Sequence, residues 1–230
     1  MENYFNYFTE IEQHYQRRRG SGLLLSTLDW ALIETWKDAG IPLEAALRGI
    51  DAAFDRWERR PKKTKRINGL GYCSQEVMSA AEEMKEAAVG TRRSDSTPAP
   101  GLETEEIAKF LGACAAKLQS IEAAETVRKT AADCAAALFE LAEGLKSAAT
   151  PPRLEDLERH LTILEEKLLA SMTMTAKESD LLAIRAQADR EIAPYRNKMQ
   201  AAQIQQLIKQ FTHKRLFDLG KIPRLSLFYM

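Results

Sequence analysis

Residues 26–57 constrain the fold most strongly, because the signals that begin, end and face two helices occur there in the right order. Ser26 and Thr27 are residue types that cap a helix start, and Gly40 can adopt the left-handed conformation that ends a helix. Pro42 follows where a second helix would begin. Apolar residues recur at helical spacing on both sides of this corner, at Leu28, Leu32, Ile33 and Trp36, and then at Leu43, Leu47, Ile50 and Phe54. We therefore expect an αα-hairpin at the centre of a small N-terminal helical domain.

Two further helices are predicted around this hairpin. Residues 3–19 carry an aromatic and aliphatic stripe, and residues 67–88 have one apolar face and one acidic face. The segment 90–101 is rich in proline, serine and glycine and lacks apolar periodicity, which is typical of a flexible linker. The sequence thus predicts a helical domain over residues 1–89, a linker over 90–101 and a second domain over 102–230.

The second domain is expected to be an antiparallel helical bundle or a long helical hairpin, so the fold class is all-α. Residues 102–145 have helical periodicity throughout, and the pattern leaves open whether they form one helix or two. Pro151 and Pro152 stop that region, and leucines at helical spacing follow over 154–168. A sustained leucine seam can also pair between chains, so a homodimer is one interpretation of this half.

Composition excludes several classes of protein. Lys+Arg and Asp+Glu are equal at 33 each, so any polyanion would have to be recognised by a local patch. The three cysteines have no CxxC spacing and no histidine stands at ligand spacing, so we expect reduced thiols, no metal and no cofactor. The sequence has no secretory signal pattern and no apolar run of about 18 residues, which favours a cytoplasmic protein without a membrane span. We find no converging acid, base and nucleophile, and expect no enzymatic activity.

Basic residues gather in two places. Arg17, Arg18 and Arg19 end the first predicted helix, where they either complement the helix dipole or contact phosphate. A second run surrounds Pro61 and is either a solvated loop or a polyanion contact; its candidate residues are Arg59, Arg60, Lys62, Lys63, Lys65 and Arg66. Tyr72 follows this run and could stack on a base.

The C-terminal segment is unusually apolar for a chain end. Pro223 disfavours a helix at Ile222, so residues 224–230 are predicted to be extended. Its apolar side chains either pack against the chain's own bundle, which we favour, or bind a partner protein; they are Leu225, Leu227, Phe228 and Tyr229.

Residues 15–77 resemble the DnaD-like helical domain of bacterial and phage replication-initiation proteins. The resemblance rests on common residue types in a shared order: Arg17-Arg18-Arg19-Gly20, Ser26-Thr27-Leu28-Asp29, Leu32-Ile33, Trp36, Gly40 and Leu43-Glu44, then Ile50, Ala53 and Phe54. Tyr72 falls where that family has a tyrosine that helps to bind single-stranded DNA. The resemblance therefore implies an all-α module that binds DNA, single- or double-stranded, together with replication or other protein partners.

Two hypotheses follow from the sequence. The first is a non-enzymatic protein of DNA replication or a related process, which binds phosphates through the basic loop and proteins through the bundle. The alternative is a structural adaptor whose ligands are other proteins, with no nucleic acid involved. Binding to DNA distinguishes the two.

Overall fold

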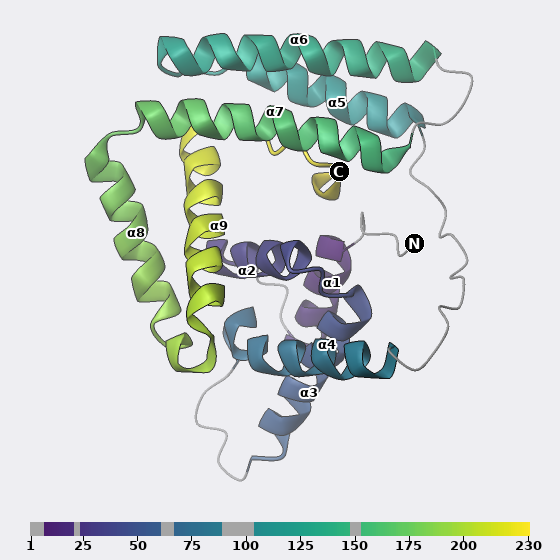
Figure 1. Ribbon diagram of the computed structural model, residues 1–230, viewed down its shortest axis with the longest axis vertical. Helices are drawn as coiled ribbons and strands as arrows, with labels where there is room; N and C mark the ends of the chain where they lie inside the picture. The colour runs from purple at the N-terminus through teal and green to yellow at the C-terminus, as the bar shows by residue number, and fades with distance from the viewer. Residues whose placement is uncertain (1–6, 21–23, 61–66, 89–103, 148–152) are drawn as a thin grey trace. The chain divides into compact units, whose positions relative to one another are not determined.

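A computed structural model describes residues 7–20, 24–60, 67–88, 104–147 and 153–230 (Figure 1). Within these ranges the regular structure consists of nine α-helices and short 3-10 turns, without a β-strand. The all-α class predicted from the sequence is thus confirmed. None of the described helices is long and apolar enough to cross a membrane.

The chain divides into two compact units whose composition differs from the predicted domains. Unit 1 contains residues 1–99 and 183–212, and unit 2 contains residues 100–182 and 213–230. Residues 183–212 therefore belong with the N-terminal part, although the sequence placed them in the C-terminal domain. The predicted linker, residues 90–101, lies outside the described residues.

Unit 1 begins with α1 (Tyr7–Arg19), α2 (Thr27–Asp38) and α3 (Leu43–Glu58). Ser26 caps α2, because its Oγ accepts a hydrogen bond from the Asp29 N–H at 3.1 Å. The corner after α2 uses Gly40 at φ +69°, which is the left-handed conformation expected of a glycine there. The helix boundaries in this region therefore agree with the capping signals in the sequence.

The two helices of the predicted hairpin follow one another but do not form the main helix pair of unit 1. Instead α3 packs along α4 (Ser74–Ala88), and α2 lies against the 3-10 turn η2 (Leu70–Tyr72). A Cβ at Gly49 of α3 would lie 2.3 Å from the Cα of Val77, so the backbones of α3 and α4 meet at this glycine. The apolar face of α3 thus packs against α4, a helix that comes later in the chain.

The remaining part of unit 1 is residues 183–212, which include most of α8 (Glu178–Ile192), the turn after it and the first part of α9 (Ala201–Gly220). Asp38 at the end of α2 accepts hydrogen bonds from the side chains of Gln206 at 3.2 Å and Gln210 at 2.6 Å. Pro194 lies in the turn after α8.

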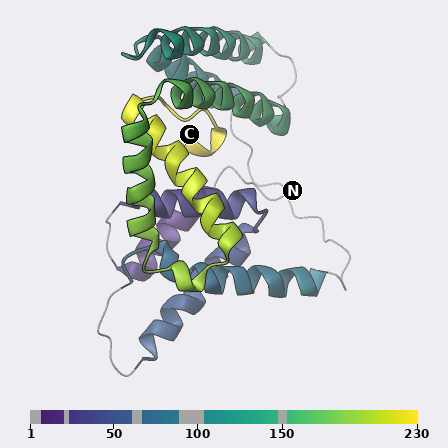
Figure 2. The same cartoon turned by 60° about the vertical axis from the view of Figure 1, so that its left-hand side comes forward.

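Unit 2 is built on α5 (Thr104–Gln119), α6 (Glu125–Ser147) and α7 (Leu154–Thr175). Residues 102–145 thus include two helices, separated where the Ser120 N–H and Oγ both bond to the Lys117 carbonyl. The helices α5 and α6 pack along each other, and α7 packs on α6 (Figures 1 and 2). The buried alanines and leucines of these helices form the core of unit 2.

The C-terminal tail completes the core of unit 2. Leu225 is 0% exposed and Leu227 is 1% exposed. Two carboxylates of α7 bind the tail's backbone: Glu165 accepts from the Leu225 N–H at 2.9 Å, and Glu158 accepts from the Leu227 N–H at 2.9 Å. The prediction that the tail packs against its own helices agrees with this arrangement.

The sequence predicts a tail that is extended to its end, but the structure differs from this prediction in the last residues. Residues Leu227–Tyr229 form a 3-10 turn, in which the Tyr229 N–H donates to the Ser226 carbonyl at 3.1 Å, and the Ser226 hydroxyl caps the turn by accepting from the Phe228 N–H at 3.2 Å. The turn allows Leu227 and Phe228 to be buried together although they are adjacent in sequence.

Candidate nucleic-acid interface

The turn η2, which contains Tyr72, is bound by the side chain of Asp29. This carboxylate is 3% exposed, and it accepts hydrogen bonds from the Leu70 N–H at 2.6 Å and from the Ser26 hydroxyl at 2.8 Å. It also accepts from the Ser26 N–H, so one side chain fixes both the start of α2 and the turn η2. The aspartate of the predicted helix start therefore also positions the loop that carries Tyr72.

A second contact connects this loop with the turn between α8 and α9. A Cβ at Gly71 would lie 2.8 Å from the ring of Tyr195, and a Cβ at Gly69 would lie 3.2 Å from the Tyr195 hydroxyl. Glycine at these two positions allows the Tyr195 ring to rest directly on the loop backbone. The α8–α9 turn is thereby brought beside Tyr72.

Tyr72 has two cations against its ring. The Nζ of Lys198 lies 4.6 Å from the ring centroid, and the Cζ of Arg60 lies 5.9 Å from it. Both cations are on exposed residues, and both distances are within the range of a cation–π interaction. We call Arg60, Tyr72 and Lys198 the basic aromatic cluster. It combines an aromatic face with positive charge, which is what a stacked base and its phosphate require.

The arginines at the end of α1 have different surroundings. Arg18 donates to Asp55 at 2.5 Å and lies 3.3 Å from Asp51, so carboxylates of α3 neutralise it. The Cζ of Arg19 lies 5.9 Å from the Tyr15 ring, and Arg17 is exposed with its Nε donating to the Gln13 carbonyl. The three arginines therefore do not act as one free basic patch.

The basic run is described only at its beginning. Arg59 forms the C-cap of α3 and is exposed, and Arg60 follows it into the basic aromatic cluster. Lys62, Lys63, Lys65 and Arg66 lie outside the described residues. Of the residues predicted to bind nucleic acid, the fold brings Arg60 and Tyr72 together.

Lys198 is the member of the cluster that the sequence analysis missed. It lies in the 3-10 turn η3 (Arg196–Lys198), far along the chain from Tyr72. The neighbouring Arg196 forms an ion pair with Asp189 at 2.5 Å, which leaves Lys198 as the cation of this turn that faces the tyrosine. No local sequence signal predicts this contact, because it depends on residues 183–212 folding back onto the N-terminal helices of unit 1.

Burial raises the pKa of several titratable groups near the cluster. Desolvation is the main cause of the raised pKa of Tyr15, Cys73 and Tyr195, and the negative charge of Asp29 adds to it. Burial also raises the pKa of Asp29 itself, although the hydrogen bonds from Ser26 and Leu70 act in the opposite direction. A buried thiol with a raised pKa is mostly protonated, so Cys73 is poorly suited to nucleophilic chemistry at neutral pH.

The other cysteines are equally buried. Cys114 and Cys134 belong to unit 2, and burial raises the pKa of Cys114 to about 11. Within the ranges that the structure describes, no three or more His, Cys, Asp and Glu side chains are grouped to hold a metal ion.

The residues predicted to bind a partner protein are mostly inside unit 2. Leu225, Leu227 and Phe228 are buried by the unit's own helices, and Tyr229 is partly exposed. The Cζ of Arg224 lies 4.8 Å from the Tyr229 ring, while the Nε of Arg224 donates to Glu165 at 2.5 Å. A partner could reach the three buried side chains only by displacing the tail.

Comparison with known proteins gives a match for the N-terminal part of the chain. A protein-family model described as "Uncharacterised protein" matches residues 6–93. No curated protein and no solved structure matches the chain.

Proposed function

We propose that this chain is a non-enzymatic, cytoplasmic protein of DNA replication or a related process, and that it binds nucleic acid through unit 1. The observation that carries the proposal is the basic aromatic cluster, in which Lys198 and Arg60 lie 4.6 and 5.9 Å from the Tyr72 ring. The resemblance of residues 15–77 to the DnaD-like module supports the same assignment, since Tyr72 occupies the position of that family's DNA-contacting tyrosine.

The cluster suggests a simple mechanism of binding. Arg60 and Lys198 would neutralise phosphates, and the face of Tyr72 would accept a base once a phosphate draws one of the cations away. A stacked base contributes about 1–3 kcal/mol, and each neutralised phosphate releases condensed counterions. Stacking requires an unpaired base, so we expect single-stranded DNA to bind more tightly than duplex.

Other cations of unit 1 have unequal roles in this proposal. Arg59 and Arg17 are exposed and would add phosphate contacts outside the cluster. Arg18 is paired with Asp51 and Asp55, so its replacement should affect the α1–α3 contact more than it affects DNA.

Fluorescence anisotropy with a labelled oligonucleotide tests the proposal. With about three cations engaged, affinity should fall roughly 20- to 40-fold when salt rises from 50 to 200 mM. Lys198→Glu should weaken binding roughly tenfold and reduce the salt slope by about one. Tyr72→Ala should weaken binding of single strands more than binding of duplex. Lys129→Glu is the matched control, because Lys129 is an exposed residue of α6 in unit 2.

The proposal is refuted if wild-type protein binds neither form of DNA at 50 mM salt. It is also refuted if Lys198→Glu and Lys129→Glu reduce affinity equally, since binding would then depend on net charge alone. The adaptor hypothesis would replace it in the first case. Circular dichroism of each variant separates a loss of binding from a loss of folding.

A further inference from the structure

We propose that the groove between α6 and α7 binds a second copy of the same two helices, forming a two-fold symmetric dimer with α7 antiparallel to its copy. The proposal concerns unit 2 alone and goes beyond nucleic-acid binding. It rests on the shape of the groove, the spacing of exposed residues along α7 and the pattern of their charges.

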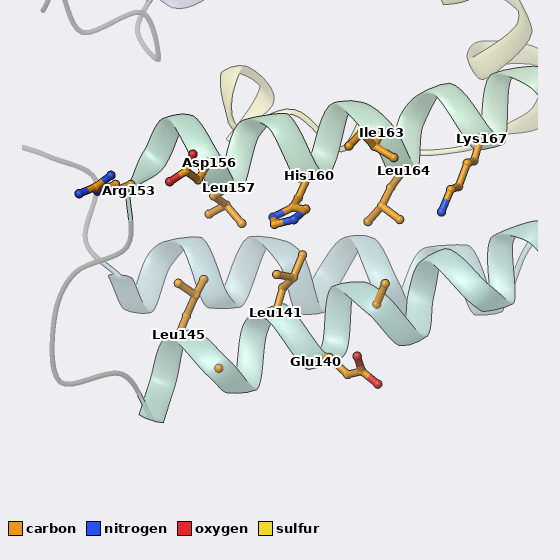
Figure 3. A pocket seen from close by; sticks show the side chains of 12 residues that line it. Glu140, Leu141, Leu145, Arg153, Asp156, Leu157, His160, Ile163, Leu164 and Lys167 are labelled. Atoms are coloured by element: carbon orange, nitrogen blue, oxygen red, sulfur yellow. The ribbon is translucent and has the colours of Figure 1, made fainter.

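The groove is an open hollow of about 560 Å³ on the surface of unit 2. Figure 3 shows Leu157, His160 and Leu164 of α7 pointing toward Leu141 and Leu145 of α6. Small residues of α6, Ala137 and Gly144, also line the groove and permit a helix to approach closely. Leucines thus form much of its floor.

Exposed residues follow α7 along the groove at alternating spacings of three and four. This spacing is the 3.5-residue repeat of a coiled-coil seam. The seam residues are Arg153, Asp156, His160, Ile163, Lys167 and Ala170. Ile163 is 44% exposed at the centre of the seam, although it is a large aliphatic side chain. The inward stripe of α7 is different and is already buried in unit 2, with Leu161 and Leu168 at 0% exposure.

The charges of the seam favour an antiparallel register in which α7 overlaps its copy over most of its length. In an antiparallel pair, the first residue of each three-residue spacing lies opposite the last residue of a three-residue spacing on the partner helix. Placing His160 opposite Ile163 of the partner subunit then places Asp156 opposite Lys167 of the partner subunit. Two-fold symmetry repeats both contacts, which gives two ion pairs that flank a centre of two isoleucines and two histidines. A shift of one heptad in either direction removes both ion pairs.

A second copy is the occupant that the mixture of charges favours. The groove is lined by the acids Glu140 and Asp156 and by the bases Arg153 and Lys167. An isologous interface must complement itself, so both signs of charge have to be present on one surface. A strongly acidic or strongly basic partner would meet like charges in this groove.

Charge-reversal variants of the full chain test the dimer. Sedimentation velocity over a range of concentrations should show wild type approaching twice the chain mass of 25.9 kDa. Asp156→Lys or Lys167→Asp alone should weaken the dimer at least tenfold, because each places like charges opposite one another. The double variant D156K/K167D exchanges the two charges and should restore the dimer. Glu155→Lys, on the same helix but outside the groove lining, is the matched control.

A wild-type protein that remains monomeric at all concentrations overturns the proposal and leaves the groove to a different partner. A dimer that none of the single variants weakens also overturns it, because that dimer would use another surface. Failure of the double variant to recover would refute the antiparallel register. Asp156 forms an exposed ion pair with Arg159 at 3.1 Å, so thermal melting should accompany each variant; an exposed pair of this kind contributes about 0–1 kcal/mol.

Discussion

Leu225 in the C-terminal tail is the side chain whose truncation should most clearly destabilise unit 2. It is 0% exposed, and its N–H is bound by Glu165 of α7. The preceding residue, Arg224, pairs with the same carboxylate and lies 5.3 Å from the Phe217 ring. Leu225→Ala keeps these backbone and charge contacts and removes only the buried apolar group.

The expected loss follows from the burial of the side chain. A fully buried leucine replaced by alanine loses about 2–5 kcal/mol, since the transfer free energy and the cavity both count. Each kcal/mol lowers Tm by about 2–4 °C for a chain of this size, so the drop should be roughly 4–20 °C. That loss is a large part of the free energy of unfolding of an ordinary domain, which is about 5–15 kcal/mol.

Differential scanning calorimetry measures this difference directly. Leu219→Ala is the matched control, because Leu219 of α9 also belongs to unit 2 but is 57% exposed. We expect Leu219→Ala to change Tm by less than a quarter of the change in Leu225→Ala. Equal melting temperatures for Leu225→Ala and wild type would contradict the buried position of the tail, and the segment would then be a candidate for docking to a partner.

Two further predictions concern unit 1. Gly49→Ala should lower the free energy of unfolding by about 1–3 kcal/mol, because the new Cβ would lie 2.3 Å from the Val77 Cα. Gly112→Ala in α5 is the control, because a Cβ there meets open space. It should raise the free energy of unfolding by about 0.5–1 kcal/mol in the same urea titration. Burial raises the pKa of Asp29 above its ordinary 3.8, so the folded state takes up this proton more readily than the unfolded state. The stability of wild type relative to Asp29→Asn should therefore be highest at pH values below the ordinary pKa of 3.8, and it should fall as the pH rises through the raised pKa of the folded state. Urea midpoints measured at pH 4 and pH 7 test this. An advantage of wild type that is constant or larger at pH 7 would contradict the prediction.

Helix boundaries in this chain could be predicted where a local signal existed. Ser26 caps α2 and Gly40 ends it because these residue types satisfy or permit the backbone conformation of a helix terminus. The break between α5 and α6 has no proline and uses the Ser120 hydroxyl on the Lys117 carbonyl. Serine is common at such positions and within helices, so the periodicity of residues 102–145 left both interpretations open.

Helix partners could not be predicted from the same patterns. The stripe of α3 indicated a buried face, but a stripe does not specify which helix covers it, and α4 rather than α2 does so. Likewise, Tyr72 and Arg60 were candidate site residues from their types and position. Lys198 joins them only because Tyr195 packs on Gly71, and this contact links distant parts of the chain.

The two proposals together predict a dependence of affinity on DNA length. A dimer would carry two basic aromatic clusters, so a strand long enough to reach both would bind the second with a high effective concentration. A strand that fills one cluster gains nothing from dimerisation. Asp156→Lys should therefore weaken binding of long single strands by about tenfold or more and leave short strands unaffected, since Asp156 lies in unit 2 and the cluster lies in unit 1. Anisotropy titrations with strands of increasing length, each at the same salt concentration, measure this difference. If the variant is monomeric and still binds long strands as tightly as wild type, the two clusters act independently, and dimerisation serves some purpose other than binding DNA.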